Sequence, residues 1–200
     1  SHRRLLSWHL RHIDELNALL AEIEQEIDHL MHPFDQADVV ARLDTIPGVD
    51  DKTAQVIIAE LGIDMSRFPT AGHAAAWAGL TPGKNESAGR NRSARTNPAN
   101  RYLKAALVQA AHAAGRSKDN YLAAQYRRLS ARRGKKRAAV AVAHSILVIA
   151  YHLIKRGTAY VDLGATYFDE RKKDTVQQQL VRRLEKLGFK VALEPLDPAA

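Results

Sequence analysis

The chain of 200 residues lacks cysteine altogether, and Phe, Trp and Tyr together make up only 6% of it. Without cysteine the protein forms neither disulfide bonds nor thiolate metal sites, and the composition fits a reducing, cytoplasmic environment. Long uninterrupted apolar runs are lacking as well. The longest, residues 138–154, is broken by His144, Ser145 and His152 and is too short to cross a bilayer comfortably. We therefore interpret this run as a buried core helix and expect no membrane partner.

A signal peptide and an initiator methionine are also lacking. Because the chain opens at Ser1 inside a helical pattern, we expect a fragment that is preceded by an upstream domain. A hydrophobic content of 46% nevertheless suffices for a sizeable buried core.

Charge is unevenly distributed along the chain. The net charge is +8, yet residues 1–64 hold 5 Lys and Arg against 13 Asp and Glu, whereas residues 65–200 hold 25 against 9. The excess is densest between Lys84 and Arg137, where 15 basic residues accompany only Glu86 and Asp119. Such a density favours a polyanionic ligand, because each phosphate contact releases counterions. A solvated, solubilising face is the alternative interpretation.

The candidate nucleic-acid-binding residues all belong to this basic segment. They are Lys84, Arg90, Arg92, Arg95, Arg101, Lys104, Arg132, Arg133, Lys135, Lys136 and Arg137. Three tyrosines, Tyr102, Tyr121 and Tyr126, are interspersed among the basic residues and have the chemistry to stack on unpaired bases. Core packing accounts for these tyrosines equally well.

The first 33 residues have the heptad spacing of a coiled coil. From Leu6 onward the pattern alternates intervals of three and four residues, and Pro33 ends it. The residues expected to mediate oligomerisation are Ile13, Leu16, Leu20, Ile23, Ile27 and Leu30. We therefore predict an amphipathic arm that pairs with another copy of the chain, giving a homo-oligomer, or with a helix folded back on it.

Residues 39–61 favour two helices joined by a tight turn. The residues expected to face inward on the second helix are Ala54, Ile57, Ile58 and Leu61. The segment 46–54 resembles a helix-hairpin-helix motif, whose turn presents backbone N–H groups to a phosphate. It departs from that motif at Asp50, where glycine is usual, and a carboxylate there repels phosphate but can cap the second helix. Phosphate binding and a purely structural turn are both open interpretations.

The remaining periodicity predicts an all-α fold. It indicates a short helix near residues 72–78, helices over 101–114, 120–131 and 136–154, and a final helix over 175–187 that stops at Gly188. We predict a coiled-coil arm (1–33), a compact helical domain (34–193) with one long loop (79–100), and a tail (194–200).

The long loop contains the candidate nucleophile, Ser87. Residues 79–100 are rich in Gly, Pro and Asn, and loops of this length inside compact domains are usually functional or disordered. Ser87 is followed by the small residues Ala88 and Gly89, and the arginines that follow can hold a phosphate that the serine attacks. On chemistry alone, a serine in such a loop is more often a turn former than a nucleophile.

Nine histidines raise the alternative of a metal site. No pair has the spacing of a known zinc motif, so we expect no metal or cofactor in this chain. We interpret His144 and His152 as packed or hydrogen-bonded core residues.

Several of these segments together resemble the C-terminal domain of bridge-RNA-guided insertion-sequence transposases. They are the helix-hairpin-helix-like segment, the Gly79-Leu80-Thr81-Pro82 loop with Ser87-Ala88-Gly89, the helix that opens at Arg101-Tyr102-Leu103, the basic stretch 132–138 and the segment 160–168. The resemblance runs nearly end to end and includes the coiled coil.

The resemblance implies a composite active site. In that family an N-terminal RuvC-like domain with a DEDD carboxylate set binds Mg²⁺, and a serine of the C-terminal domain attacks DNA and forms a 5′-phosphoserine link. DNA and a structured guide RNA are the implied partners, and Mg²⁺ is expected only in the upstream domain of the parent enzyme. The family's Ser-Gly pair falls on Ser87 and Ala88, with the glycine displaced to Gly89, so Ser93 is the second candidate.

Two other functions use the same features. A non-catalytic nucleic-acid-binding module would have Ser87 as a turn residue only. An assembly module would oligomerise through the arm and bind RNA passively through its basic face.

Overall fold

The all-α prediction is confirmed by the computed structural model, which describes residues 2–31, 36–83, 86–87, 90–91, 96 and 98–193. Its helices are α1 (His2–Met31), α2 (Gln36–Asp44), α3 (Asp51–Leu61), α4 (Ala71–Trp77), α5 (Arg101–Arg116), α6 (Tyr121–Arg133), α7 (Lys135–Arg156), α8 (Tyr167–Glu170) and α9 (Lys173–Lys186). A 3₁₀ turn at Met65–Arg67 and the two-residue strands β1 (Glu86–Ser87) and β2 (Arg90–Asn91) are the other described elements. The predicted ends of α5, α6, α7 and α9 lie within two residues of the observed ones.

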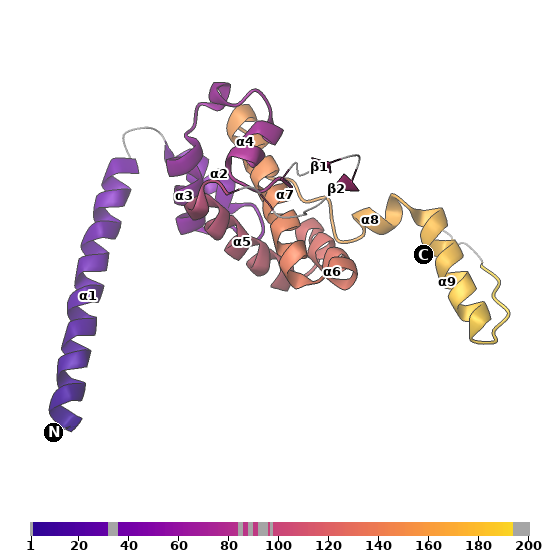
Figure 1. The fold of residues 1–200 in the computed structure, drawn as a ribbon, viewed down its shortest axis with the longest axis horizontal. Coiled ribbons are helices and arrows are strands. Elements are labelled where there is room, and N and C mark those ends of the chain that lie inside the picture. Colours follow the sequence, from indigo (N-terminus) through magenta and orange to yellow (C-terminus); the bar gives the residue numbers. More distant parts are fainter. Residues whose placement is uncertain are drawn as a thin grey trace, which may run out of the picture.

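Helix α7 is the centre of the compact body, and α4, α5 and α6 pack around it (Figure 1). The largest fully buried side chains of the body are Tyr151, Leu43, Ile46, Ile57, Leu61, Leu103, Leu107, Leu122, Ile146, Leu147 and Val142. By length and hydropathy α7 alone among the described helices has the composition of a membrane span, yet nine of its side chains are buried in the core. This confirms the interpretation of residues 138–154 as a core helix.

The helix pair α2–α3 is joined by a turn that packs against α5. Gly48 has a φ of +88°, and a β-carbon built on it would lie 2.4 Å from the carbonyl oxygen of Ala110 and 2.5 Å from the nitrogen of Ala114. Only a residue without a side chain allows the two backbones to approach so closely. On α3, the four side chains predicted to face inward are all buried.

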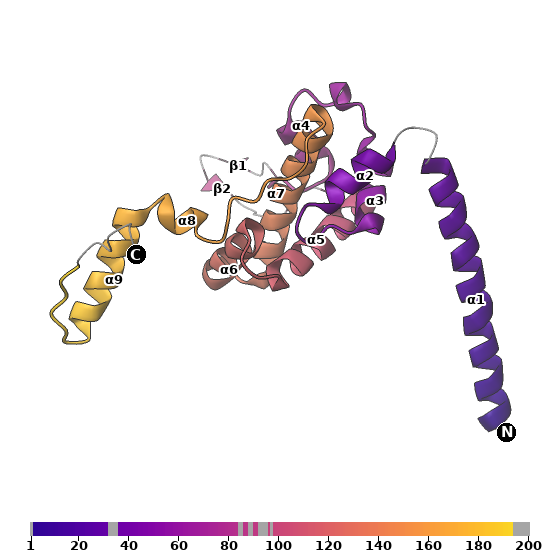
Figure 2. The same ribbon diagram turned by 180° about the vertical axis from the view of Figure 1, so that it is seen from behind.

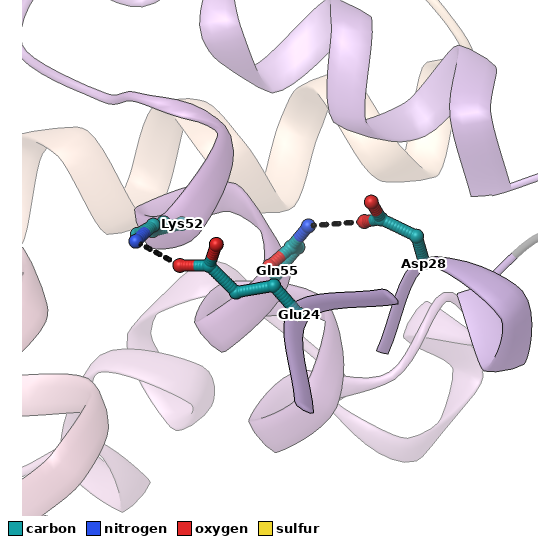
Figure 3. Close-up of polar contacts among 4 residues, drawn as sticks. All are labelled: Glu24, Asp28, Lys52 and Gln55. Carbon is teal, nitrogen blue, oxygen red and sulfur yellow. Dashed lines mark hydrogen bonds and ion pairs between the residues drawn. The ribbon is translucent and has the colours of Figure 1, made fainter. Parts of the chain in front are cut away.

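Helix α1 extends away from the compact body (Figures 1 and 2). All its described side chains are exposed, including the apolar heptad positions, of which Leu20 is 55% and Ile27 is 38% exposed. Its contacts with the body are polar: Lys52 Nζ lies 2.5 Å from Glu24 Oε1, and the Gln55 amide donates to Asp28 Oδ1 at 3.5 Å (Figure 3). The described residues of this chain therefore offer no apolar partner for the arm.

The chain after α7 crosses the body and then leaves it. The backbone N–H of Tyr160 donates to Thr45 Oγ1 (3.1 Å), and the backbone N–H of Tyr121 donates to Asp162 Oδ1 (3.1 Å), so the segment is fixed to the end of α2 and to the start of α6. Beyond it, α9 packs on α8 and stands apart from the core (Figure 2). The apolar stripe of α9 is exposed, and this helix is followed by Gly188 with a φ of +89°, as the sequence predicts.

Candidate serine loop and nucleic-acid interface

The base of the serine loop is fixed to the core on both sides. Leu80 is only 3% exposed, and its N–H donates to the Ala75 carbonyl at 2.9 Å. Pro82 and Thr96 form an antiparallel bridge, and Lys104 Nζ donates to Thr96 Oγ1. The loop therefore leaves and re-enters the body at one point, beside the first turns of α5.

Within the loop the structure places a short hairpin that the sequence analysis does not predict. Ser87 pairs with Arg90, and Glu86 pairs with Asn91, in antiparallel register. The candidate residues Lys84, Arg92, Arg95 and the second candidate nucleophile Ser93 lie outside the described residues.

The start of α5 provides the first described cations near the loop. Asn100 caps the helix by accepting from the N–H of Leu103 at 3.0 Å, and its amide donates to Glu60 on α3. Arg101 is exposed and lies over the Tyr102 ring, 4.8 Å from its centroid. One nitrogen of its guanidinium donates to the Tyr102 hydroxyl at 2.9 Å, and its remaining N–H groups can donate to a phosphate.

A second basic cluster surrounds the junction between α6 and α7. Its members are Arg132, Arg133, Lys135, Lys136 and Arg137, and all five are exposed. None of them belongs to an ion pair among the described residues, where Arg128 with Asp169 (3.6 Å) is the nearest such pair along the chain. The five positive charges are therefore available to an external anion.

The N-terminus of α7 adds to this positive charge. Gly134 precedes α7 with a φ of 82°, and no side chain caps the helix. The first-turn N–H groups and the positive end of the helix dipole thus coincide with three cationic side chains, an unfavourable arrangement unless an anion is nearby.

A cavity of about 810 Å³ lies between the loop base and this cluster. Its described lining residues are Leu80, Pro82, Thr96, Leu129, Arg133, Lys136, Arg137, Ala138, Val140 and Ala141. The fold therefore brings the two ends of the serine loop together with Arg133, Lys136 and Arg137, which are more than 30 residues away in sequence. Arg101, Arg132 and Lys135 are not part of this lining.

The helix-hairpin-helix-like turn has the geometry of a structural joint. Asp50 caps α3 by accepting from the N–H of Thr53 at 2.8 Å. Hydrogen bonds from the side chain and the backbone of Thr53 lower the pKa of the Asp50 carboxyl group. The carboxylate occupies the helix N-terminus that a phosphate would need. Of the two interpretations of this turn, the geometry favours the structural one.

The three candidate stacking tyrosines differ in their environments. Tyr102 is 62% exposed, whereas Tyr126 packs against Gly115 and donates or accepts a hydrogen bond with His112 Nδ1 at 3.1 Å. Tyr121 is half-buried and stacks on Phe168, with ring centroids 5.1 Å apart. Packing therefore accounts for Tyr126, Tyr121 is covered on one side by Phe168, and Tyr102 is open on the surface.

The prediction that His144 and His152 are core residues needs correction. Both are half-buried and line a second cavity, between α7 and the segment that follows it. Burial lowers the pKa of His144. They lie off the core because their spacing places them on the face of α7 that looks toward this segment rather than toward α5.

Asp162 organises that segment, although the sequence does not predict it as a functional residue. Its carboxylate accepts from the N–H groups of Tyr121 (3.1 Å) and Gly164 (2.6 Å) and from the Tyr160 hydroxyl (2.9 Å). The Asp-x-Gly order is the only local signal, since it is typical of a turn in which Asp accepts from the N–H two residues on. The contact with Tyr121, 41 residues away in sequence, has no local signal.

Comparison with known proteins identifies one family for this region. Residues 40–127 match the model of the Transposase IS116/IS110/IS902 family. The matched segment runs from α2 through the serine loop to the middle of α6, so it contains the loop base and the start of α5, and it supports a transposase domain here. None of the curated proteins compared with the chain matches it.

Proposed function

We propose that this chain is the part of a DNA transposase that binds nucleic acid and supplies Ser87 as the nucleophile for strand cleavage and exchange. The supporting observation is that the match to the transposase family spans the loop whose base lies against Arg133, Lys136 and Arg137. A nucleophile and cations that hold the phosphate are the two parts that serine attack on a phosphodiester requires, and the base of the loop that carries Ser87 lies against such cations.

The proposed step is a phosphoryl transfer between oxygens. The Ser87 hydroxyl loses its proton to a base, and its Oγ attacks the phosphorus, so that an Oγ–P bond forms. The P–O3′ bond breaks, and the 3′ oxygen leaves as a hydroxyl once it is protonated. In strand exchange a different 3′ hydroxyl attacks the phosphoserine, the Oγ–P bond breaks, and the serine is regenerated. The cationic cluster neutralises the negative charge that builds up on the phosphoryl oxygens.

The described residues of this chain do not fit the Mg²⁺ that the resemblance implies for the parent enzyme. They contain no group of three or more His, Asp or Glu side chains able to share a metal ion. We therefore assign the metal-binding carboxylates and the base to another domain of the parent enzyme, and the contributions assigned here are the nucleophile and the cations.

The test uses covalent trapping of DNA by the parent enzyme. Ser87→Ala should abolish protein–DNA adducts and recombination while DNA binding stays nearly unchanged, because the change removes a nucleophile and no phosphate contact. Ser93→Ala, in the same loop, is the matched control and should retain adducts. Adducts formed at the normal rate by the Ser87→Ala enzyme would refute the assignment and favour Ser93.

A second measurement separates specific use of the basic cluster from a solvated face. Replacing Arg133, Lys136 and Arg137 with Gln should weaken binding to all DNA sequences alike and reduce the slope of log K against log salt by up to about three contacts. Replacing Arg182, Arg183 and Lys186 on the outlying α9 with Gln removes the same number of charges and is the control for loss of charge alone. Equal effects of the two sets would indicate that the cluster only contributes net charge.

A further inference from the structure

A second cavity lies at the opposite half of α7 from the serine loop. It has a volume of about 520 Å³ and is enclosed by the C-terminal half of α7, the first residue of α6 and the chain segment 158–163. Its lining includes the apolar residues Val148, Ile149 and Leu153. Nothing in the serine chemistry uses this cavity.

The walls of the cavity carry aromatic and basic groups. Tyr121 and Tyr160 line it together with His144 and His152, and Arg156 lies at its exposed end. Tyrosine and histidine rings and arginine planes are the side chains on which proteins stack unpaired bases. Four such rings around one cavity, in a chain with only six tyrosines and nine histidines, indicate a planar aromatic ligand.

The two tyrosines are held in place without a ligand. Tyr121 stacks on Phe168 at an interplanar angle of 19° and meets Tyr167 edge-on. The Tyr160 hydroxyl donates to Asp162, whose carboxylate also accepts from the backbone of Tyr121. Because these contacts already fix the walls, little side-chain ordering opposes binding.

The histidine chemistry favours a ligand with hydrogen-bonding edges. Burial lowers the pKa of His144, so its ring is neutral near pH 7 and offers one N–H donor and one acceptor. None of the hydrogen bonds among the described residues uses this ring. The carboxylate of Asp162 keeps its negative charge, but it accepts from three donors of the protein and is not among the residues that line the cavity.

We propose that this cavity binds an unpaired nucleobase from a single-stranded segment of the nucleic acid that the protein holds, with Arg156 contacting the adjoining phosphate. The proposal rests on the proposed function only in taking nucleic acid as the ligand. It adds a separate binding site on the same helix: along α7 the residues that line the cavity begin at His144, about 10 Å from Arg137, and end at Arg156, about 28 Å from Arg137, at about 1.5 Å per residue. It predicts that bases, and not only phosphates, contribute to affinity.

Photocrosslinking locates the base directly. The probes are short single strands of RNA and of DNA with one sequence, each carrying 5-iodouracil, and crosslinked peptides of the full chain are identified by mass spectrometry. We expect crosslinks at Tyr121, His144, His152 or Tyr160, and the stronger of the two probes identifies the natural source. Crosslinks confined to Tyr102 and the basic cluster would overturn the proposal.

Affinity measurements test the same site independently. Relative to the intact strand, a strand with abasic positions should bind roughly five- to 150-fold more weakly, as expected for stacking of about 1–3 kcal/mol per base. Arg156→Ala should reduce affinity for the intact strand severalfold, whereas Arg116→Ala, an exposed arginine in the last turn of α5, should not. Equal binding of intact and abasic strands, or equal effects of both variants, would refute the proposal.

Failure of this proposal is distinguishable from failure of the proposed function. The Ser87→Ala chain should give the same crosslinks as the unmodified chain, because the cavity does not include the serine loop. If serine adducts form and no base enters the cavity, only the second site is wrong. If the base crosslinks form and no adduct does, only the nucleophile is wrong.

Discussion

Replacing Gly48 with alanine should destabilise the protein far more than an ordinary surface change. Gly48 has a φ of +88°, and the added methyl would meet the carbonyl oxygen of Ala110 at 2.4 Å and the nitrogen of Ala114 at 2.5 Å. Both are backbone atoms of buried residues of α5, so no side-chain rotation relieves the contact. The helix pair α2–α3 must therefore move away from α5.

The expected loss combines two costs. A non-glycine residue in this backbone region costs about 1–3 kcal/mol, and overpacking a close interface adds about 1–3 kcal/mol. The sum, roughly 2–6 kcal/mol, is a large part of the 5–15 kcal/mol that is typical of whole domains. For a chain of this size the melting temperature should fall by roughly 5–20 °C.

Gly62→Ala is the matched control. Gly62 ends α3 with a φ of +75°, but a β-carbon there would meet only the Arg67 guanidinium, at 3.8 Å. This variant should show the backbone cost alone, about 1–3 kcal/mol. Urea denaturation followed by far-UV circular dichroism measures both variants. Equal losses of free energy of unfolding would refute the view that the turn is a packed joint with α5.

Three further results are expected. Asp50→Ala should cost about 1 kcal/mol in urea denaturation because it removes the cap of α3, whereas Asp51→Ala, which removes no capping bond, should cost less. Burial lowers the pKa of His144, so its contribution to the free energy of unfolding is complete above about pH 6.5 and is lost as pH falls through its lower folded-state pKa. In the His144→Gln protein the urea midpoint should therefore change less over that pH range, while the loss of stability caused by other groups at lower pH remains. An unchanged pH profile would contradict this. Leu20→Lys combined with Ile27→Lys should give monomers by light scattering if the exposed heptad face of α1 pairs copies of the chain, and an unchanged mass would contradict that pairing.

Periodicity alone predicts most of the helices, because local spacing decides which side chains share a helix face. The stripe of α5, for example, is buried at Leu103, Leu107, Ala110 and Ala114, as the sequence indicates. The same kind of stripe on α9 is exposed, since amphipathicity shows that a helix has an apolar face and not what covers it. Burial of a stripe depends on contacts with elements far away in sequence.

The candidate site could be predicted only in part. Loop chemistry indicates Ser87, and charge density indicates the α6–α7 junction, but nothing local shows that Leu80 and Arg133 line one cavity. The second cavity is harder still, because it depends on the return of residues 158–163 across α7 and on the contact of Asp162 with α6. Contacts between segments so far apart in the chain leave no periodic signal in the sequence.

Because positive charge is crowded at the start of α7, added salt should have opposite effects on the stability of the free fold and on nucleic-acid binding. Lys135, Lys136 and Arg137 repel one another and the helix dipole, so added salt should screen this repulsion and stabilise the free fold. The same salt weakens a complex that depends on counterion release. Folding and nucleic-acid binding thus respond to one variable in opposite directions, and a bound polyanion should replace salt as the stabilising agent of the fold.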